Sequence, residues 1–150
     1  MQNLDLASED ETRALGARLA TLLQRGDVVA LHGDLGAGKT TLVRGLIQSI
    51  LGPATEVPSP TYALVQMYEG PSFPLWHFDL YRIEQAGDLQ ELGWDDTPGG
   101  VALIEWPQRA GAHLPENRLD VFLQNSGEGR RARLEARGEG WQERLDELFV

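Results

Sequence analysis

The sequence lacks cysteine, contains a single lysine and has no long apolar run. Without cysteine there is no disulfide framework, no thiolate metal site and no cysteine nucleophile. No apolar stretch approaches the roughly 20 residues that a membrane-spanning helix needs. The first residues, Met1 to Asp5, lack the basic and apolar regions of a signal peptide. We therefore expect a cytoplasmic protein with no membrane contact.

Positive charge is also scarce. Thirteen basic residues face 23 acidic ones, which gives a formal net charge of −10. Such acidity repels nucleic acid phosphates and anionic membranes, so any role in an RNA pathway is expected to run through a partner. The acidic residues are unevenly distributed along the chain, because the segment from Asp79 to Asp120 holds nine acidic and three basic residues. That segment is either a solvated acidic face or a docking surface for a basic partner.

The stretch from Gly33 to Thr40 matches the phosphate-binding P-loop pattern G-x-x-x-x-G-K-[ST]. Glycines let successive backbone N–H groups point at phosphate oxygens, Lys39 reaches the β- and γ-phosphates, and the Thr40 hydroxyl can ligate Mg²⁺. Lys39 is the single lysine beside 12 arginines. It stands where a compact ammonium fits and a planar guanidinium is too large. The pattern predicts a nucleoside triphosphate site.

The order of expected elements around this motif indicates an α/β protein of the P-loop NTPase fold. We expect a mixed, mostly parallel central sheet flanked by helices, with two antiparallel strands near the C-terminus, and a single P-loop ATPase domain over residues 1–150. A capping box at Ser8 to Glu11 begins a first helix, which ends at Gly26-Asp27. Further helices are expected at 41–51, 84–92 and 138–149, and strands at 28–31, 62–68, 75–81, 101–106, 119–123 and 131–136.

Two acids follow apolar stretches that read as strands. Asp79 comes after Leu75 to Phe78, and Glu105 comes after Val101 to Ile104. The carboxyl ends of strands are where open α/β sheets bind ligands, and a P-loop needs acids to hold Mg²⁺ and to place the nucleophile. Both acids are therefore candidates for that work. His77 is a poor Mg²⁺ ligand because the ion prefers oxygen, and we interpret it as mainly structural or as a neighbour of a residue that binds the metal.

The loop Pro58-Ser59-Pro60-Thr61 is stiffened by its two prolines. It presents Thr61 at a defined place, as nucleotide switches present a threonine that senses the γ-phosphate and Mg²⁺. Taken alone, a Pro-Ser-Pro turn is often only a turn. Beside the P-loop, the switch interpretation is favoured.

Five short blocks follow one another along the chain: Gly33–Leu42, Ser59–Tyr62, His77–Arg82, Glu91–Gly93 and Ile104–Pro107. In this order and spacing they closely resemble the TsaE family, also called YjeE, and the resemblance covers about residues 8 to 109. The Asp-Leu-Tyr-Arg motif of the third block and the Ile-Glu-Trp-Pro motif that forms the fifth are more specific than the P-loop. One small departure is Tyr62, where phenylalanine is common. Beyond residue 110 no motif is apparent.

The resemblance implies a function as well as a fold. Family members bind ATP and Mg²⁺, hydrolyse ATP weakly when alone, and take part in bacterial tRNA threonylcarbamoyladenosine biosynthesis. They act with TsaD and TsaB, which install threonylcarbamoyl on N6 of adenosine 37, and ATP hydrolysis is thought to reset that complex between turnovers. The implied contact with tRNA is indirect, through these partners.

The resemblance also implies roles for individual residues. Lys39 would contact the phosphates, and Thr40 and Glu105 would hold Mg²⁺. Asp79 would be a catalytic or water-positioning acid, and Thr61 would lie in a switch loop; we group Asp79, Glu105 and Thr61 as catalytic candidates. The remaining nucleotide-binding candidates are Thr12, Gly33, Asp34, Gly36, Ala37, Gly38, Thr41 and Trp106, of which Thr12 would lie near the base and Trp106 would border the nucleotide.

Two other functions remain open from the residues alone. A stand-alone small-molecule kinase would usually need a lid with catalytic arginines, yet residues 45 to 81 contain no arginine. A nucleotide-gated binding module without appreciable hydrolysis would use the same cradle, so the sequence does not separate it from an ATPase.

Overall fold

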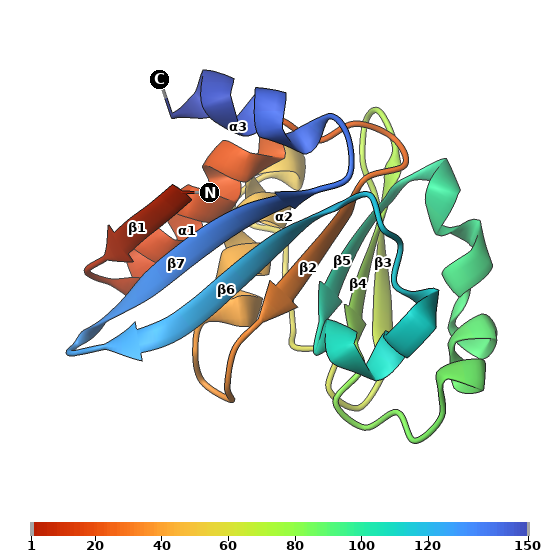
Figure 1. The fold of residues 1–150 in the computed structure, drawn as a ribbon. Coiled ribbons are helices and arrows are strands. Elements are labelled where there is room, and N and C mark those ends of the chain that lie inside the picture. Colours follow the sequence, from red (N-terminus) through yellow and green to blue (C-terminus); the bar gives the residue numbers. More distant parts are fainter. Residues whose placement is uncertain (1, 150) are drawn as a thin grey trace.

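The computed structural model describes residues 2–149, which form one seven-stranded sheet with helices on both faces (Figure 1). The strand order is β1-β7-β6-β2-β5-β4-β3. The strands are β1 (Gln2–Leu6), β2 (Val28–His32), β3 (Val65–Glu69), β4 (Pro74–Asp79), β5 (Val101–Glu105), β6 (Arg118–Ser126) and β7 (Gly129–Arg137). The helices are α1 (Glu9–Ala20), α2 (Lys39–Leu51) and α3 (Trp141–Leu148), with 3-10 helices at Ala86–Leu92, Trp94–Gly99 and Pro107–His113.

The four central strands, β6, β2, β5 and β4, run parallel, while β3, β7 and β1 pair antiparallel at the two sides. The α/β fold expected from the sequence is therefore confirmed. The two C-terminal strands are antiparallel to each other, as expected, but β6 joins the sheet parallel to β2. The antiparallel partner of β6 is β7, to which a tight turn connects it.

The apolar runs of β2 and β5 explain why these strands occupy the middle of the sheet. Val28 to Leu31 and Val101 to Ile104 are buried throughout, as strands covered on both faces require. Because β4 and β5 are parallel and in register, Asp79 is paired directly with Glu105 at their carboxyl ends. The P-loop leaves the carboxyl end of β2 at the same edge, so the sheet brings the acids and the loop together.

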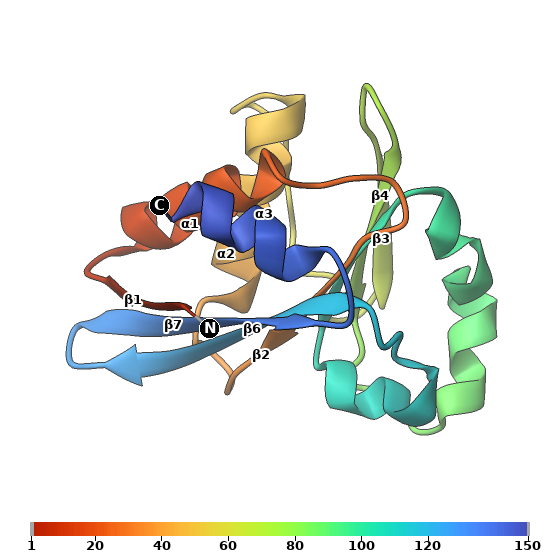
Figure 2. The ribbon, with the colours of Figure 1, turned by 45° about the horizontal axis from the view of Figure 1, so that its top comes forward.

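Helices α1, α2 and α3 cover one face of the sheet, as the turned view of Figure 2 shows. Glycines let α1 and α2 approach closely: a methyl group at Gly16 would overlap the Leu42 carbonyl oxygen, and one at Gly45 would overlap the Arg13 carbonyl oxygen. This close approach seats the start of α1 beside the P-loop. Thr12 lies close to Gly38, since a Cβ atom at that glycine would stand 3.6 Å from the Thr12 methyl carbon.

The other face of β2, β5 and β4 is covered by the 3-10 helices between residues 86 and 113. Trp76, Phe78 and Ile104 pack there against Leu89 and Trp94. Phe78 and Trp94 meet edge to face with ring centroids 5.1 Å apart, an arrangement that aromatic pairs prefer. The segment expected to be helical at 84–92 is thus present as a 3-10 helix from Ala86 to Leu92.

Several element ends differ from the sequence-based expectation. Helix α1 begins as predicted, with the Ser8 hydroxyl accepting the Glu11 N–H and the Glu11 carboxylate accepting the Ala7 N–H. It ends at Ala20 rather than at Gly26-Asp27. Strand β3 begins at Val65, because the preceding Leu64 has a left-handed φ of 70° that breaks the extended backbone. Strand β4 ends at Asp79, and α3 is confined to residues 141–148 within the expected 138–149.

Strand β1 was not expected from the sequence. It pairs antiparallel with β7, matching Leu4 to Ala132 and Leu6 to Arg130. Within residues 2–149, no helix has the length and apolar character that crossing a bilayer requires.

Candidate functional site

The P-loop forms a strand–loop–helix cradle at the carboxyl edge of the sheet. Gly36 and Gly38 have positive φ values of 78° and 104°, which only glycine adopts without strain, and Gly38 caps α2. Helix α2 begins at Lys39, so its free N–H groups and its positive dipole end face the cavity above the loop. A helix N-terminus of this kind is an anion site.

Lys39 is 5% exposed and lies across the loop. Its Nζ donates to the carbonyl oxygens of Gly33 at 2.6 Å and Asp34 at 2.8 Å, and stands 4.3 Å from the centre of the Trp106 ring. Burial lowers the pKa of Lys39, and the negative charges of Glu105, Asp79 and Asp34 act against that shift. Two of these acids, Asp79 and Glu105, are paired at the carboxyl ends of β4 and β5.

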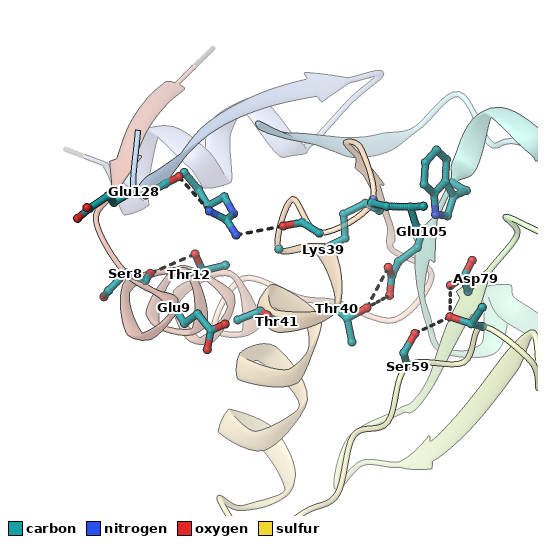
Figure 3. Close-up of a pocket in the computed structure, with 17 residues that line it drawn as sticks. Ser8, Glu9, Thr12, Lys39, Thr40, Thr41, Ser59, Asp79, Glu105 and Glu128 are labelled. Carbon is teal, nitrogen blue, oxygen red and sulfur yellow. Dashed lines mark hydrogen bonds between the residues drawn. The ribbon is translucent and has the colours of Figure 1, made fainter. Parts of the chain in front are cut away.

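Thr40 and Glu105 meet directly. The Thr40 hydroxyl lies 2.8 Å from Glu105 Oε2 and 3.1 Å from Oε1 (Figure 3). Glu105 is 3% exposed, and its Oε2 also lies 2.6 Å from Nε2 of the fully buried His77. A buried carboxylate needs such partners, because burial of an unpaired charge is costly. The two oxygen-bearing groups assigned to Mg²⁺ from the sequence are thus adjacent.

Asp79 and Thr61 form a second contact at the same edge. The Thr61 hydroxyl donates to Asp79 Oδ2 at 3.2 Å and is 2.8 Å from the Ser59 hydroxyl, while Asp79 Oδ1 accepts the Tyr81 N–H at 3.0 Å. The proline-stiffened loop therefore ends against a strand-end carboxylate. In Figure 3, Ser59 and Asp79 lie on the side of the cavity where Glu105 meets Thr40.

Trp106 follows Glu105 with a strained backbone. Its φ of 58° and ψ of 51° are left-handed, which costs about 1–2 kcal/mol for a residue other than glycine. The ring packs on Lys39 and on Tyr81, whose ring centroid is 4.8 Å away. Strain of this kind concentrates at functional sites, where the surrounding structure holds it.

These groups line a cavity of about 510 Å³. Helix α1 closes its other flank, where Figure 3 shows Ser8, Glu9 and Thr12 across from Thr40 and Glu105. Gly33, Asp34 and Ala37, which the sequence also nominated, do not line it: Gly33 backs onto the Leu123 carbonyl, and Asp34 contributes its carbonyl to Lys39. The nominated residues that line the cavity are Thr12, Gly36, Gly38, Lys39, Thr40, Thr41, Thr61, Asp79, Glu105 and Trp106.

Sequence reasoning missed the contribution of the β6–β7 hairpin. Arg130 donates from Nε to the Ala37 carbonyl at 3.1 Å and from a terminal nitrogen to the Gly36 carbonyl at 3.0 Å, and it lines the cavity. No motif marks this arginine, which lies more than 90 residues beyond the loop that it contacts. The other lining residues not nominated from the sequence are Ser8, Glu9, Leu35, Ser59, Glu128 and Gly129.

Comparison with protein-family models gives a match over residues 6–133 to the family described as threonylcarbamoyl adenosine biosynthesis protein TsaE. The chain belongs to the TsaE family. The match extends past residue 109, where the resemblance seen in the sequence ends, and takes in β6 and the first part of β7, including Arg130.

Individual relatives agree with this assignment. The chain is 38% identical over 129 residues to the tRNA threonylcarbamoyladenosine biosynthesis protein TsaE of Rickettsia felis, covering 85% of this chain and 75% of that protein. The Bacillus subtilis protein of the same name is 37% identical over 124 residues, covering 81% and 77%. The crystal structure of Bacillus subtilis YdiB superposes with a TM-score of 0.84 at 30% identity, covering 99% of this chain and 93% of that one.

The arrangement in this TsaE-family chain suits one kind of chemistry. A cradle of backbone N–H groups and one ammonium faces two buried carboxylates across a cavity of about 510 Å³. The cradle can bind a polyphosphate, and the carboxylates can hold a hard cation or orient a nucleophile.

Proposed function

We propose that this chain binds ATP with Mg²⁺ in the P-loop cavity and hydrolyses it slowly on its own, and that protein partners raise the rate. The observation that carries the proposal is the contact of the Thr40 hydroxyl with Glu105 at 2.8 Å beside the buried Lys39. It puts a hydroxyl and a carboxylate together at the first turn of the P-loop helix, where a phosphate-bound cation belongs.

The residues present fit Mg²⁺. The ion prefers oxygen ligands and is commonly held through one or two carboxylates together with substrate phosphates. Thr40 and Glu105 supply such oxygens within hydrogen-bond distance of each other, and they would hold the ion. When bound, Mg²⁺ neutralises charge on the β- and γ-phosphate oxygens.

Other residues would act on the phosphates and on water. Lys39 would exchange the Gly33 and Asp34 carbonyls for phosphate oxygens, since its ammonium is already held over the loop. Asp79 would orient the attacking water, and Thr61, hydrogen-bonded to it, would sense the γ-phosphate. In the alternative assignment, Glu105 orients the water.

We further propose that the chain works in tRNA threonylcarbamoyladenosine biosynthesis together with TsaD and TsaB, which carry the transfer chemistry. The names of the relatives support the pathway. The net charge of −10 favours contact with tRNA through those partners rather than directly. ATP hydrolysis would then reset the complex and would not phosphorylate a metabolite.

The test is phosphate release from ATP, measured for the chain alone and after addition of TsaB and TsaD. We expect slow release alone, a clear increase with both partners, and no release from Lys39→Ala in either condition. Transfer of the γ-phosphate to a small metabolite without stimulation by the partners would instead establish a kinase. Tight ATP binding with no release in any mixture would establish a nucleotide-gated binding module.

A further inference from the structure

His77 is a fully buried histidine whose ring contacts the candidate metal ligand. It lies in β4, two residues before Asp79, with its side chain 0% exposed. Its Nε2 is 2.6 Å from Glu105 Oε2, a distance at the short end for a hydrogen bond. The strand register pairs His77 with Leu103 and Asp79 with Glu105, so the imidazole reaches Glu105 from the neighbouring strand.

The Glu105 carboxylate is thus held from two sides. Thr40 donates from α2, and His77 donates from β4. The Thr40 hydroxyl is itself a candidate Mg²⁺ ligand, so its lone pairs and its proton must reorganise when a cation arrives. His77 is not a candidate Mg²⁺ ligand, so its hydrogen bond can keep the Glu105 carboxylate oriented both with and without the cation.

Among the described residues, Glu105 is the one hydrogen-bond partner of the His77 imidazole. Within the described residues 2–149, His77 Nδ1 is buried and has no hydrogen-bond partner. A carboxylate that holds a cation is an acceptor only, so the short contact places a proton on Nε2. Leaving the buried polar atom Nδ1 unpaired is unfavourable, and groups of this kind in folded proteins call for a functional explanation.

We infer that His77 is a positioning residue that fixes the Glu105 carboxylate and thereby sets the affinity of the site for its divalent cation. The inference rests on the proposed function, in which Glu105 is the metal-binding carboxylate. Partners that hydrogen-bond to a metal ligand orient it, and their loss typically weakens metal binding about 10–100-fold. The side chain does not touch the nucleotide cavity, so its effect must pass through Glu105.

The test is Mn²⁺ binding to the nucleotide-loaded chain, followed by electron paramagnetic resonance, together with nucleotide binding in EDTA. For His77→Leu, which keeps a buried side chain but removes the donor, we expect Mn²⁺ affinity to fall about 10–100-fold. Nucleotide affinity in EDTA is expected to change less than about twofold, since the P-loop contacts are retained. His77→Gln, whose amide can donate to the same oxygen, is expected to recover most of the loss.

His32→Leu is a matched control. His32 also pairs with a buried carboxylate, at 2.9 Å from Asp120, but this carboxylate, unlike Glu105, does not line the nucleotide cavity. This variant is expected to lower the thermal unfolding temperature without changing Mn²⁺ affinity. Thermal unfolding of both histidine variants checks that each is folded at the temperature of the titration.

Three results would overturn the inference: unchanged Mn²⁺ affinity in His77→Leu, equal losses of Mn²⁺ and metal-free nucleotide binding, or a defect that glutamine does not reduce. Glu105→Gln separates the two proposals. If Glu105→Gln weakens Mn²⁺ binding and His77→Leu does not, the positioning role fails while the metal assignment stands. If Glu105→Gln leaves Mn²⁺ binding intact, Glu105 is not a metal ligand, and the positioning role of His77 fails with that assignment.

Discussion

Asp120 is a buried carboxylate that stands apart from the nucleotide cavity. It is 1% exposed, and it accepts contacts from His32 at 2.9 Å, Arg118 at 3.0 Å and Arg137 at 3.2 Å. Burial raises the pKa of Asp120, but the hydrogen bonds and charges of His32 and Arg118 outweigh burial and hold this pKa below the ordinary value of 3.8. The ionised Asp120 carboxylate therefore contributes to the stability of the folded sheet.

This lowered pKa predicts acid sensitivity. A carboxyl whose pKa is lower in the folded than in the unfolded chain stabilises the fold above the unfolded value of 3.8, and that contribution is lost as pH falls through the folded value. We expect the denaturation midpoint of the wild type to fall more steeply than that of Asp120→Asn as the pH drops below about 4. The variant is expected to be less stable by about 2 kcal/mol at neutral pH, through weaker charged hydrogen bonds. Parallel pH profiles for the two proteins would contradict this account.

At the scale of elements, the β6–β7 hairpin braces the P-loop. Arg130, at the start of β7, donates to two P-loop carbonyls, and the Leu123 carbonyl of β6 closes on Gly33 so tightly that a side chain there would not fit. The loop is therefore held from the C-terminal part of the chain as well as by β2 and α2.

Loss of the Arg130 hydrogen bonds to the P-loop is expected to weaken nucleotide binding. For Arg130→Ala we expect ATP affinity, measured by fluorescent-nucleotide titration, to fall about 10-fold, equivalent to ~1.4 kcal/mol. Two charge-assisted hydrogen bonds to the loop would be lost, and part of their strength is already screened by solvent. Arg131→Ala is the control, because the next side chain along the strand points to the opposite face, where it pairs with the exposed Asp5. Equal effects of the two substitutions would argue against a specific brace.

Elements that depend on local signals could be predicted from the sequence, and those that depend on distant pairing could not. The Ser8 capping box, the β2–P-loop–α2 unit and the apolar β5 each carry their signal within a few neighbouring residues. Strand β1 is short and half polar, and it becomes a strand by pairing with β7 at the other end of the chain. Likewise, the alternation in β6 predicted a strand but held no information on whether its neighbour would be parallel.

The site shows the same division. The rule that strand-end acids gather at one edge placed Asp79 and Glu105 correctly, since the register of β4 and β5 pairs them. The structure adds that the buried His77 contacts Glu105. The alternation of side chains along β4 could not distinguish such a contact from burial in the core. Arg130 had no motif to reveal it, because its function depends on where the hairpin folds back.

At the scale of the whole molecule, two sets of acidic residues differ in burial. Asp27, Asp79, Glu105 and Asp120 are buried and paired, and Asp79 and Glu105 face the P-loop cavity. Acids on the 84–96 segment are exposed and lie over the 3-10 helices, away from α1, α2 and α3 (Figure 1). Their exposure makes the carboxylates of this segment accessible to solvent and to a basic partner.

The central claim is that the P-loop cavity binds ATP and a divalent cation through Lys39, Thr40 and Glu105. The most direct measurement is calorimetric titration of ATP into the chain, with and without Mg²⁺. We predict one site per chain for the wild type, no binding for Lys39→Ala, and binding that no longer responds to Mg²⁺ for Glu105→Ala. ATP binding by Lys39→Ala at wild-type affinity, or an unchanged response to Mg²⁺ in Glu105→Ala, would contradict the account.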